Sequence, residues 1–157
     1  DGNRAYEYCK AALPAAYNDK AEIRQSEPYV QGQTTYSIFS PRAGNTRTSW
    51  LSGAATWSYY SLTQYILGIR PQYEGMMIDP CVPDSWDGFK VQRRFRGKKL
   101  NIEVKNLSHV CKGIAELSLN GEKLTGNVIP ADKLKDENTI VAVMGKVQNG
   151  KEYAERV

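Results

Sequence analysis

Apolar and polar positions follow two different periods along the chain, and the change falls near residue 70. Before it, apolar residues recur at helical spacing, whereas after it they alternate with polar residues as they do in strands. The first pattern predicts a helix over residues 3–17 that is interrupted around Pro14. It also predicts a stronger helix over residues 49–67, which ends at Gly68.

The segment between these helices, residues 18–47, is polar and contains several prolines and glycines. We interpret it as a long ordered loop with a short extended piece at Tyr29–Val30. Loops of this length in compact domains are usually functional. The segment is therefore the first place to search for a site.

Strand-like alternation begins after Pro71. The turn Gly97-Lys98-Lys99 separates two alternating runs and predicts a hairpin, and Asn120-Gly121 is a strong signal for a second one. The predicted strands cover residues 89–95, 100–104, 114–119, 122–124 and 140–144.

The patterns together predict an α+β protein with three parts: residues 1–71 with the helices and the loop, residues 72–145 with the strands, and a tail at 146–157. Two helices alone cannot enclose a core, so their apolar faces need partners from the β module or from protein outside this sequence. Because the sequence starts at Asp1, inside a predicted helix and without Met, we expect it to be part of a longer polypeptide.

The opening of the second predicted helix suits an anion. Thr48 or Ser49 is the predicted N-cap, which places Ser52 and Gly53 in the first turn, where backbone N–H groups lack intrahelical partners. The positive end of the helix dipole also favours phosphate or sulfate there. A glycine in a helix costs roughly 1 kcal/mol relative to alanine. Either close approach of a ligand or tight packing explains Gly53, and the sequence leaves both open.

The number and distribution of charged residues favour a local anion-binding site over a nucleic-acid-binding surface. The net charge is only +4, with 24% charged residues, which is not the composition of a dedicated nucleic-acid binder. The basic run at residues 92–99 alternates, which favours a solvated sheet face. However, residues 28–73 contain no Asp or Glu, while Arg42, Arg47 and Arg70 lie in that stretch.

Cysteine and histidine usage argues against a metal site. The three cysteines are widely spaced without a CxxC pair, and His109 is the only histidine. We therefore predict no metal and a reduced, cytoplasmic protein. The apolar runs are too short to span a bilayer, so we expect no membrane partner.

Several motifs occur in the order typical of the C-terminal end of the inverting β-glycoside phosphorylases, the family of cellobiose, cellodextrin and chitobiose phosphorylases. They are Glu27-Pro28-Tyr29-Val30, Gln33, Ser49-Trp50-Leu51-Ser52-Gly53-Ala54-Ala55, Ile66-Leu67-Gly68-Ile69-Arg70-Pro71, Ile78-Asp79-Pro80-Cys81-Val82-Pro83 and Trp86-Asp87-Gly88-Phe89. The sequence resembles this family over about residues 25 to 145. The resemblance implies the last helices of an (α/α)6 barrel, followed by an antiparallel β-sandwich of jelly-roll type.

The resemblance also implies a reaction. Family members cleave β-linked gluco-oligosaccharides of cellobiose or cellodextrin type with inorganic phosphate, and they release α-glucose-1-phosphate with inversion. Ser52 and Gly53 match a phosphate-binding Thr-Gly pair, Arg47 adds positive charge beside them, and Gln33 matches a glutamine that contacts the donor sugar. The implied partners are the oligosaccharide, phosphate as co-substrate without a further cofactor, the rest of the catalytic chain, and a second copy.

Departures from the family pattern limit what these residues do alone. The general-acid motif of Asp-Trp-Asn-Asp type is absent, so we assign no catalytic residue and expect the 157 residues to be inactive by themselves. The loop at residues 44–48 reads Gly-Asn-Thr-Arg-Thr where cellobiose phosphorylases have Gly-Glu-Ala-Lys-Asn, which leaves the acceptor sugar open. We expect Glu27 to orient this loop, and Trp50 and Trp57 to be core residues.

A second class of function stays open. The β module could be non-catalytic and either buttress a partner domain or bind carbohydrate. The predicted strands show no obvious row of exposed aromatic residues, which favours buttressing.

Overall fold

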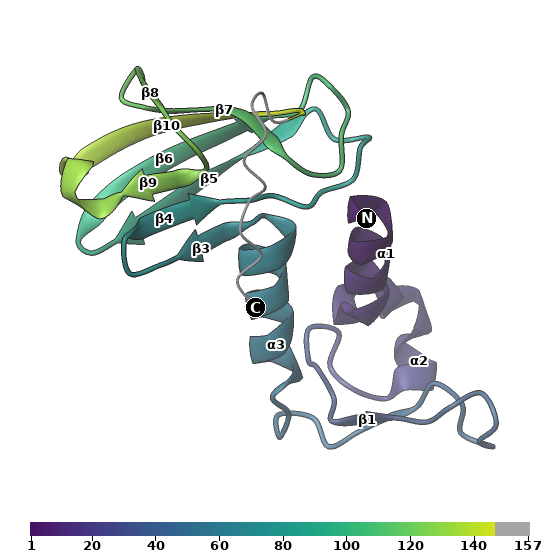
Figure 1. Ribbon diagram of the computed structural model, residues 1–157. Coiled ribbons are helices and arrows are strands. Elements are labelled where there is room, and N and C mark those ends of the chain that lie inside the picture. The colour runs from purple at the N-terminus through teal and green to yellow at the C-terminus, as the bar shows by residue number, and fades with distance from the viewer. Residues whose placement is uncertain (147–157) are drawn as a thin grey trace.

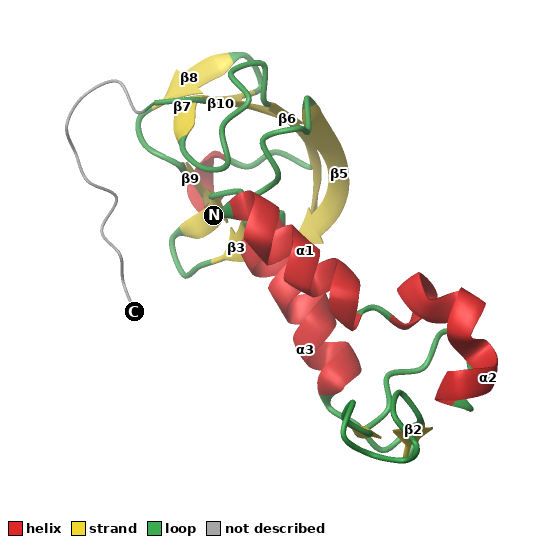
Figure 2. Ribbon diagram, turned by 90° about the vertical axis from the view of Figure 1, so that its right-hand side faces the viewer, coloured by secondary structure: helices red, strands yellow, loops and turns green. Residues whose placement is uncertain are grey.

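The computed structural model describes residues 1–146. It places a β unit at one end, helices α1 and α3 beside one another in the middle, and the loop segment at the far end (Figures 1 and 2). This mixture of helices and sheets confirms the α+β class. The predicted tail, 146–157, lies outside the described residues except for Lys146.

The first helical region is interrupted as the sequence predicted. Helix α1, Gly2–Ala12, begins at Asp1, whose carboxylate accepts a hydrogen bond of 3.2 Å from the Arg4 amide. The 3-10 helix η1, Pro14–Lys20, and the single turn α2, Ala21–Arg24, follow. The break confirms the prediction, because a proline cannot donate the backbone hydrogen bond that would continue α1.

The second helix starts later than predicted. Helix α3, Ala54–Tyr60, runs directly into a π-helical stretch, η2, Ser61–Ile66. The predicted start at residue 49 is wrong because Thr48 and Trp50 have φ angles of +57° and +69°, which a right-handed helix cannot contain. The predicted end is confirmed, since Gly68 has a φ of +66°.

The segment between the helices contains more structure than a plain loop. The predicted extended piece at Tyr29–Val30 is wrong, because a turn there lets the Val30 amide donate to the Glu27 carbonyl over 3.1 Å. Two short strands lie further along, β1, Thr34–Thr35, and β2, Thr46–Arg47, and they pair antiparallel.

Two sheets form the β unit, in the orders β5-β6-β10-β7-β8 and β3-β4-β9. Their strands are β3, Ile69–Pro71; β4, Gly75–Ile78; β5, Gly88–Phe95; β6, Lys98–Lys105; β7, Ile114–Leu119; β8, Glu122–Leu124; β9, Val128–Pro130; and β10, Glu137–Met144. A short 3-10 helix, η3, Ala131–Lys133, leads into β10. Both predicted hairpins are confirmed, with positive φ at Arg96-Gly97 and at Asn120-Gly121. The predicted turn Gly97-Lys98-Lys99 is wrong in position, because Lys98 and Lys99 already pair with β5 as part of β6 and the turn is Arg96-Gly97.

The prediction of a purely antiparallel sheet is wrong at one pair. Strand β10 lies between β6 and β7, parallel to β6 with Ile140 opposite Ile102, and antiparallel to β7 with Ile140 opposite Leu119. Alternation along a strand is the same in either direction, so the sequence could not reveal this pairing. The jelly-roll topology and the barrel stay predictions.

One apolar core lies between the two sheets. It combines Met76 and Ile78 of β4 with Leu100 and Ile102 of β6 and with Ile140 of β10, all at most 2% exposed. The helical part adds little to this core. Among the described residues before 66, only one belongs to the buried hydrophobic set, whereas most of the exposed large hydrophobic side chains lie there. The β unit therefore does not cover the apolar faces of the helices, which still need partners.

Candidate functional site

The residues singled out from the sequence lie at the end of the molecule that is farthest from the sheets, around β1, β2 and the start of α3 (Figure 1). The β1–β2 pair closes a hairpin in which the Tyr36 amide donates to the Asn45 carbonyl and the Gly44 amide donates to the Tyr36 carbonyl, both over 2.9 Å. A Cβ atom on Gly32 would come within 1.9 Å of the Thr46 Cγ2 atom. Glycine at position 32 therefore permits the close approach of the two chain segments.

The hairpin brings Gln33 and Arg47 together through their backbones. The Gln33 amide donates to the Arg47 carbonyl over 3.2 Å and to the Thr48 carbonyl over 3.3 Å. Both side chains are exposed, and within residues 1–146 neither forms a side-chain hydrogen bond or ion pair. They are therefore available to a ligand.

The start of α3 assigns Ser52 a more specific position than the sequence did. Thr48 and Ser49 are not the N-cap; Gly53 occupies that position, without a side-chain capping bond. The Ser52 hydroxyl oxygen accepts a hydrogen bond of 3.0 Å from the Ala54 amide, and so takes over part of the capping role. Since its oxygen serves as the acceptor, the hydroxyl proton remains free to donate to an anion.

Packing does not explain Gly53 within the described residues. Its φ is −73°, which any residue adopts, and a Cβ atom there would meet only the Trp57 ring at 3.7 Å, an ordinary contact. Of the two explanations that the sequence left open, tight packing thus finds no support. Gly53 is itself the N-cap, a position at which glycine is common, so the cost expected for a glycine inside the helix does not apply and a role in ligand binding stays a prediction.

Glu27 orients the loop, as predicted. The Trp50 indole donates to the Glu27 carboxylate over 3.0 Å, and the Trp50 ring meets Tyr29 edge to face at 6.0 Å. The backbone amide of Glu27 and the Trp50 indole together hold the pKa of Glu27 below its ordinary value. The expectation that Trp50 and Trp57 are core residues is wrong for this chain, where they are 67% and 71% exposed.

Replacing Trp50 by Phe is expected to raise the pKa of Glu27 toward its ordinary value of 4.5. A carboxyl whose pKa is lowered in the folded state stabilises the fold above pH 4.5, and this stabilisation is lost as the pH falls through the folded-state pKa. The Trp50→Phe variant should therefore lose part of the stabilisation that ionised Glu27 contributes at neutral pH. A carbon-13 NMR titration of the Glu27 carboxyl measures the shift. Trp57→Phe is the control and should leave it unchanged. Equal titration of both variants would show that the indole does not act on Glu27.

The arrangement supplies hydrogen-bond donors without an acid. Residues 28–73 contain no carboxylate side chain, and Glu27 is engaged by Trp50. In the described part of the chain, no group of three or more His, Cys, Asp or Glu could hold a metal ion. Among residues 1–146, no helix is both long and apolar enough to cross a bilayer. The donors of Gln33, Arg47 and Ser52 are suited to an anion or a polar ligand, and Glu22 lines a hollow beside Arg47.

Sequence reasoning missed a hollow beside Arg47. It lies between the turn of α2 and residues 41–47, and Arg42 and Asn45 also line it. The sequence drew attention to Arg42 only because residues 28–73 contain arginines but no Asp or Glu, and this pattern does not predict where Arg42 lies in the fold. Glu22, on the opposite wall, lies 20 residues away from Arg42 in sequence, so spacing could not reveal the pair.

Comparison with known proteins identifies a family. The catalytic domain of the glycosyl hydrolase 94 superfamily matches residues 1–68. N,N'-diacetylchitobiose phosphorylase from Vibrio proteolyticus is 37% identical over 144 residues, 92% of this chain and 18% of that protein. Solabiose phosphorylase from Paenibacillus borealis is 30% identical over 129 residues, 82% of this chain and 17% of that protein.

The chain thus spans less than a fifth of the length of these relatives. A solved structure of the family GH92 alpha-mannosidase BT3965 from Bacteroides thetaiotaomicron superposes with a TM-score of 0.40 and 19% sequence identity. The superposition covers 90% of this chain and 17% of that chain, and the TM-score is too low to show a common fold. The motifs, the matched domain and the phosphorylase relatives agree with one another. The chain therefore belongs to the glycosyl hydrolase 94 superfamily.

Proposed function

We propose that this chain supplies the phosphate-binding and donor-sugar-binding side of an inverting glycoside phosphorylase. The reaction is phosphorolysis of a β-linked disaccharide or short oligosaccharide, with inorganic phosphate as co-substrate and no further cofactor. Relatives that are named as chitobiose and solabiose phosphorylases support this reaction class. A gluco-oligosaccharide of cellobiose or cellodextrin type, giving α-glucose-1-phosphate, is the substrate that we propose within it.

The observation that carries the proposal is the opening of α3. The Ser52 hydroxyl can donate a hydrogen bond, since its oxygen already accepts one from the Ala54 amide. Gly53 has no side chain to block access to the backbone, and the first amides of a helix lack intrahelical acceptors. Phosphate attacks the sugar from the side opposite to the leaving oxygen, and it needs no protein base because it is already an anion. We assign Ser52, Gly53 and Arg47 to phosphate and Gln33 to the donor sugar.

In this proposal the general acid is a carboxylic acid from another part of the complete enzyme, since this sequence has no motif of Asp-Trp-Asn-Asp type. The complete enzyme would also cover the exposed helix faces with the rest of its catalytic domain. Association of two copies and a cytoplasmic location stay predictions.

In the complete polypeptide, Ser52→Ala is expected to lower kcat/KM for phosphate by about 5- to 150-fold, the equivalent of roughly 1–3 kcal/mol for a hydrogen bond to a charged group. Ser52→Thr should restore most of the loss, because it keeps the hydroxyl. Phosphorolysis rates at varied phosphate concentration measure the effect, with the isolated 157 residues as the blank. Ser61→Ala, at the start of η2, is the control. An unchanged phosphate dependence in Ser52→Ala would remove Ser52 from the site.

A buttressing role for the β unit is a second candidate, and one contact set favours it. Leu62 and Leu67, at the end of the second helix, and Cys9 of α1 pack against the core between the sheets. The Asn3 side chain also exchanges hydrogen bonds with Asp84, at 3.0 and 3.2 Å. We propose that the sheets hold the ends of both helices in place. This role is compatible with phosphorolysis at the other end of the molecule.

A further inference from the structure

A short bent segment, residues 48–51, joins the two halves of the proposed phosphate site between β2 and α3 (Figure 2). On one side, the Arg47 carbonyl accepts from the Gln33 amide over 3.2 Å, which fixes Arg47 to the hairpin. On the other side, the Ala54 amide fixes the Ser52 hydroxyl to α3. The segment therefore sets where Arg47 and Ser52 lie relative to each other.

The backbone of this segment is strained. Thr48 and Trp50 have φ angles of +57° and +69°, in the left-handed region that costs free energy for any residue with a Cβ atom. Thr48 is also β-branched, which makes this conformation rarer still. Such residues persist only where their surroundings hold them, and they concentrate at functional sites. A contact from elsewhere in the fold must therefore keep residues 48–51 in this shape.

Backbone hydrogen bonds do not hold the middle of the segment. Within residues 1–146, neither the amide nor the carbonyl of Ser49, Trp50 or Leu51 forms a hydrogen bond. The nearest backbone bond is the one that the Thr48 carbonyl accepts from the Gln33 amide, over 3.3 Å. Because neither strand pairing nor the helix reaches these three residues, a side chain has to supply the restraint.

Glu27 supplies that restraint from 23 positions earlier in the chain. Its carboxylate accepts a hydrogen bond of 3.0 Å from the Trp50 indole, and the Trp50 ring also meets Tyr29 edge to face. Glu27 is itself held in a turn, because its carbonyl accepts from the Val30 amide over 3.1 Å and Val30 is only 4% exposed. The indole thus ties the strained segment to a fixed point of the fold.

We propose that Glu27 is a positioning residue for phosphate, which acts through the Trp50 indole to hold residues 48–51 in the shape that places Arg47 and the Ser52 hydroxyl around one anion. This inference rests on the proposed function and gives Glu27 and Trp50 a part in phosphate affinity. Glu27 does not bind phosphate itself in this role, since a carboxylate in contact with a second anion would repel it.

Phosphorolysis of cellobiose by the complete polypeptide, at varied phosphate concentration, tests this role. Glu27→Ala and Trp50→Phe should each raise the KM for phosphate by about 10-fold and change the KM for cellobiose by less than about threefold, since misplacing a group by about 1 Å can cost as much as about 100-fold. Trp50→Phe is a mild change, because it keeps a ring beside Tyr29 and removes only the donor.

Two further variants separate positioning from a direct contact. Glu27→Gln should keep the KM for phosphate within about threefold of the unaltered enzyme, because an amide oxygen still accepts from the indole. The double variant Glu27→Ala, Trp50→Phe should stay near 10-fold, roughly the effect of either change alone, because both changes remove the same hydrogen bond. Glu74→Ala, an exposed carboxylate between β3 and β4, is the matched control and should change neither KM.

Three results would overturn the positioning role while Ser52→Ala still weakens phosphate use, which would leave the proposed function intact. They are an unchanged KM for phosphate in Glu27→Ala and Trp50→Phe, effects that multiply in the double variant, and a loss in Glu27→Ala that Glu27→Gln does not relieve. The last would place the carboxylate charge in direct contact with a ligand. No release of glucose-1-phosphate by the unaltered polypeptide would overturn the proposed function, and this inference with it.

Discussion

Gly68→Ala is expected to destabilise the chain by about 3 kcal/mol or more, because the added methyl group has no room and the backbone is left-handed. Gly68 has a φ of +66°, and a Cβ atom would come within 2.0 Å of the Asp79 carbonyl oxygen and 2.3 Å of the Pro80 nitrogen. Both neighbours are backbone, so neither can rotate away. The Asp79 amide also donates to the Gly68 carbonyl over 2.8 Å, which fixes the two segments side by side.

Urea denaturation of the 157-residue chain, followed by circular dichroism, measures this loss. Gly97→Ala is the matched control, because Gly97 has a similar φ of +79° but no atom within 4 Å of the added Cβ. The control should cost only about 1–2 kcal/mol, the cost of the left-handed backbone alone. Equal losses in the two variants would show that the contact with Asp79 does not constrain residue 68.

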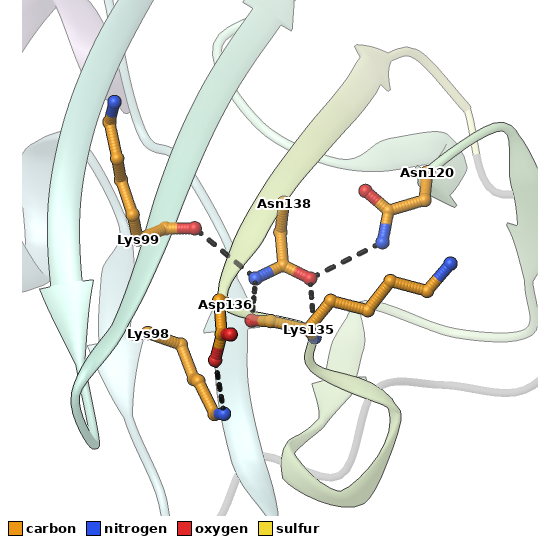
Figure 3. A network of polar contacts seen from close by, with 6 residues as sticks. All are labelled: Lys98, Lys99, Asn120, Lys135, Asp136 and Asn138. Carbon is orange, nitrogen blue, oxygen red and sulfur yellow. Dashed lines mark hydrogen bonds and ion pairs between the residues drawn. The ribbon is translucent and has the colours of Figure 1, made fainter.

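Asn138→Ala is expected to lower the free energy of unfolding by about 2–4 kcal/mol, because it removes a buried amide that bonds to three partly buried backbone groups. Asn138 is 1% exposed. Its amide nitrogen donates to the Lys135 carbonyl over 2.7 Å and to the Lys99 carbonyl over 3.2 Å, and its oxygen accepts from the Lys135 amide over 3.0 Å (Figure 3). One side chain thus joins the start of β10 to β6.

Further polar contacts surround Asn138, and a second asparagine, Asn101 on β6, offers a control for the substitution. Asn120 donates to the Asn138 oxygen over 3.3 Å, and the adjacent Lys98–Asp136 ion pair, at 2.8 Å, lowers the pKa of Asp136 through a hydrogen bond and charge attraction (Figure 3). Asn101→Ala, on the outer face of β6, removes an exposed amide and should change stability by less than about 0.5 kcal/mol. Similar urea midpoints for the two variants would contradict the role of Asn138.

The hairpins and the helix ends could be predicted from the sequence, because each depends on residues that are close together in the chain. The alternation of β5 and β6 and the Asn120-Gly121 turn were sufficient for both hairpins, because two-residue hairpin turns require positive φ, which Asn and Gly adopt at low cost. The break at Pro14 and the end at Gly68 follow from the chemistry of single residues.

Long-range contacts determined what the sequence could not predict. The helix that was expected from residue 49 starts at Ala54, with Trp50 left-handed where its indole bonds to Glu27, 23 positions earlier. At the candidate site, Ser52 and Gly53 were found from the sequence, but their positions relative to the helix start were not.

The place of β10 in the five-stranded sheet sets an order of events during synthesis on the ribosome. Strands β6 and β7 emerge before β10, and neither has its full set of backbone partners until β10 enters between them. The two hairpins can form early because their contacts are local, whereas the sheet that unites them waits for β10. Until residue 144 has left the exit tunnel, the inner edges of both hairpins remain open to other chains.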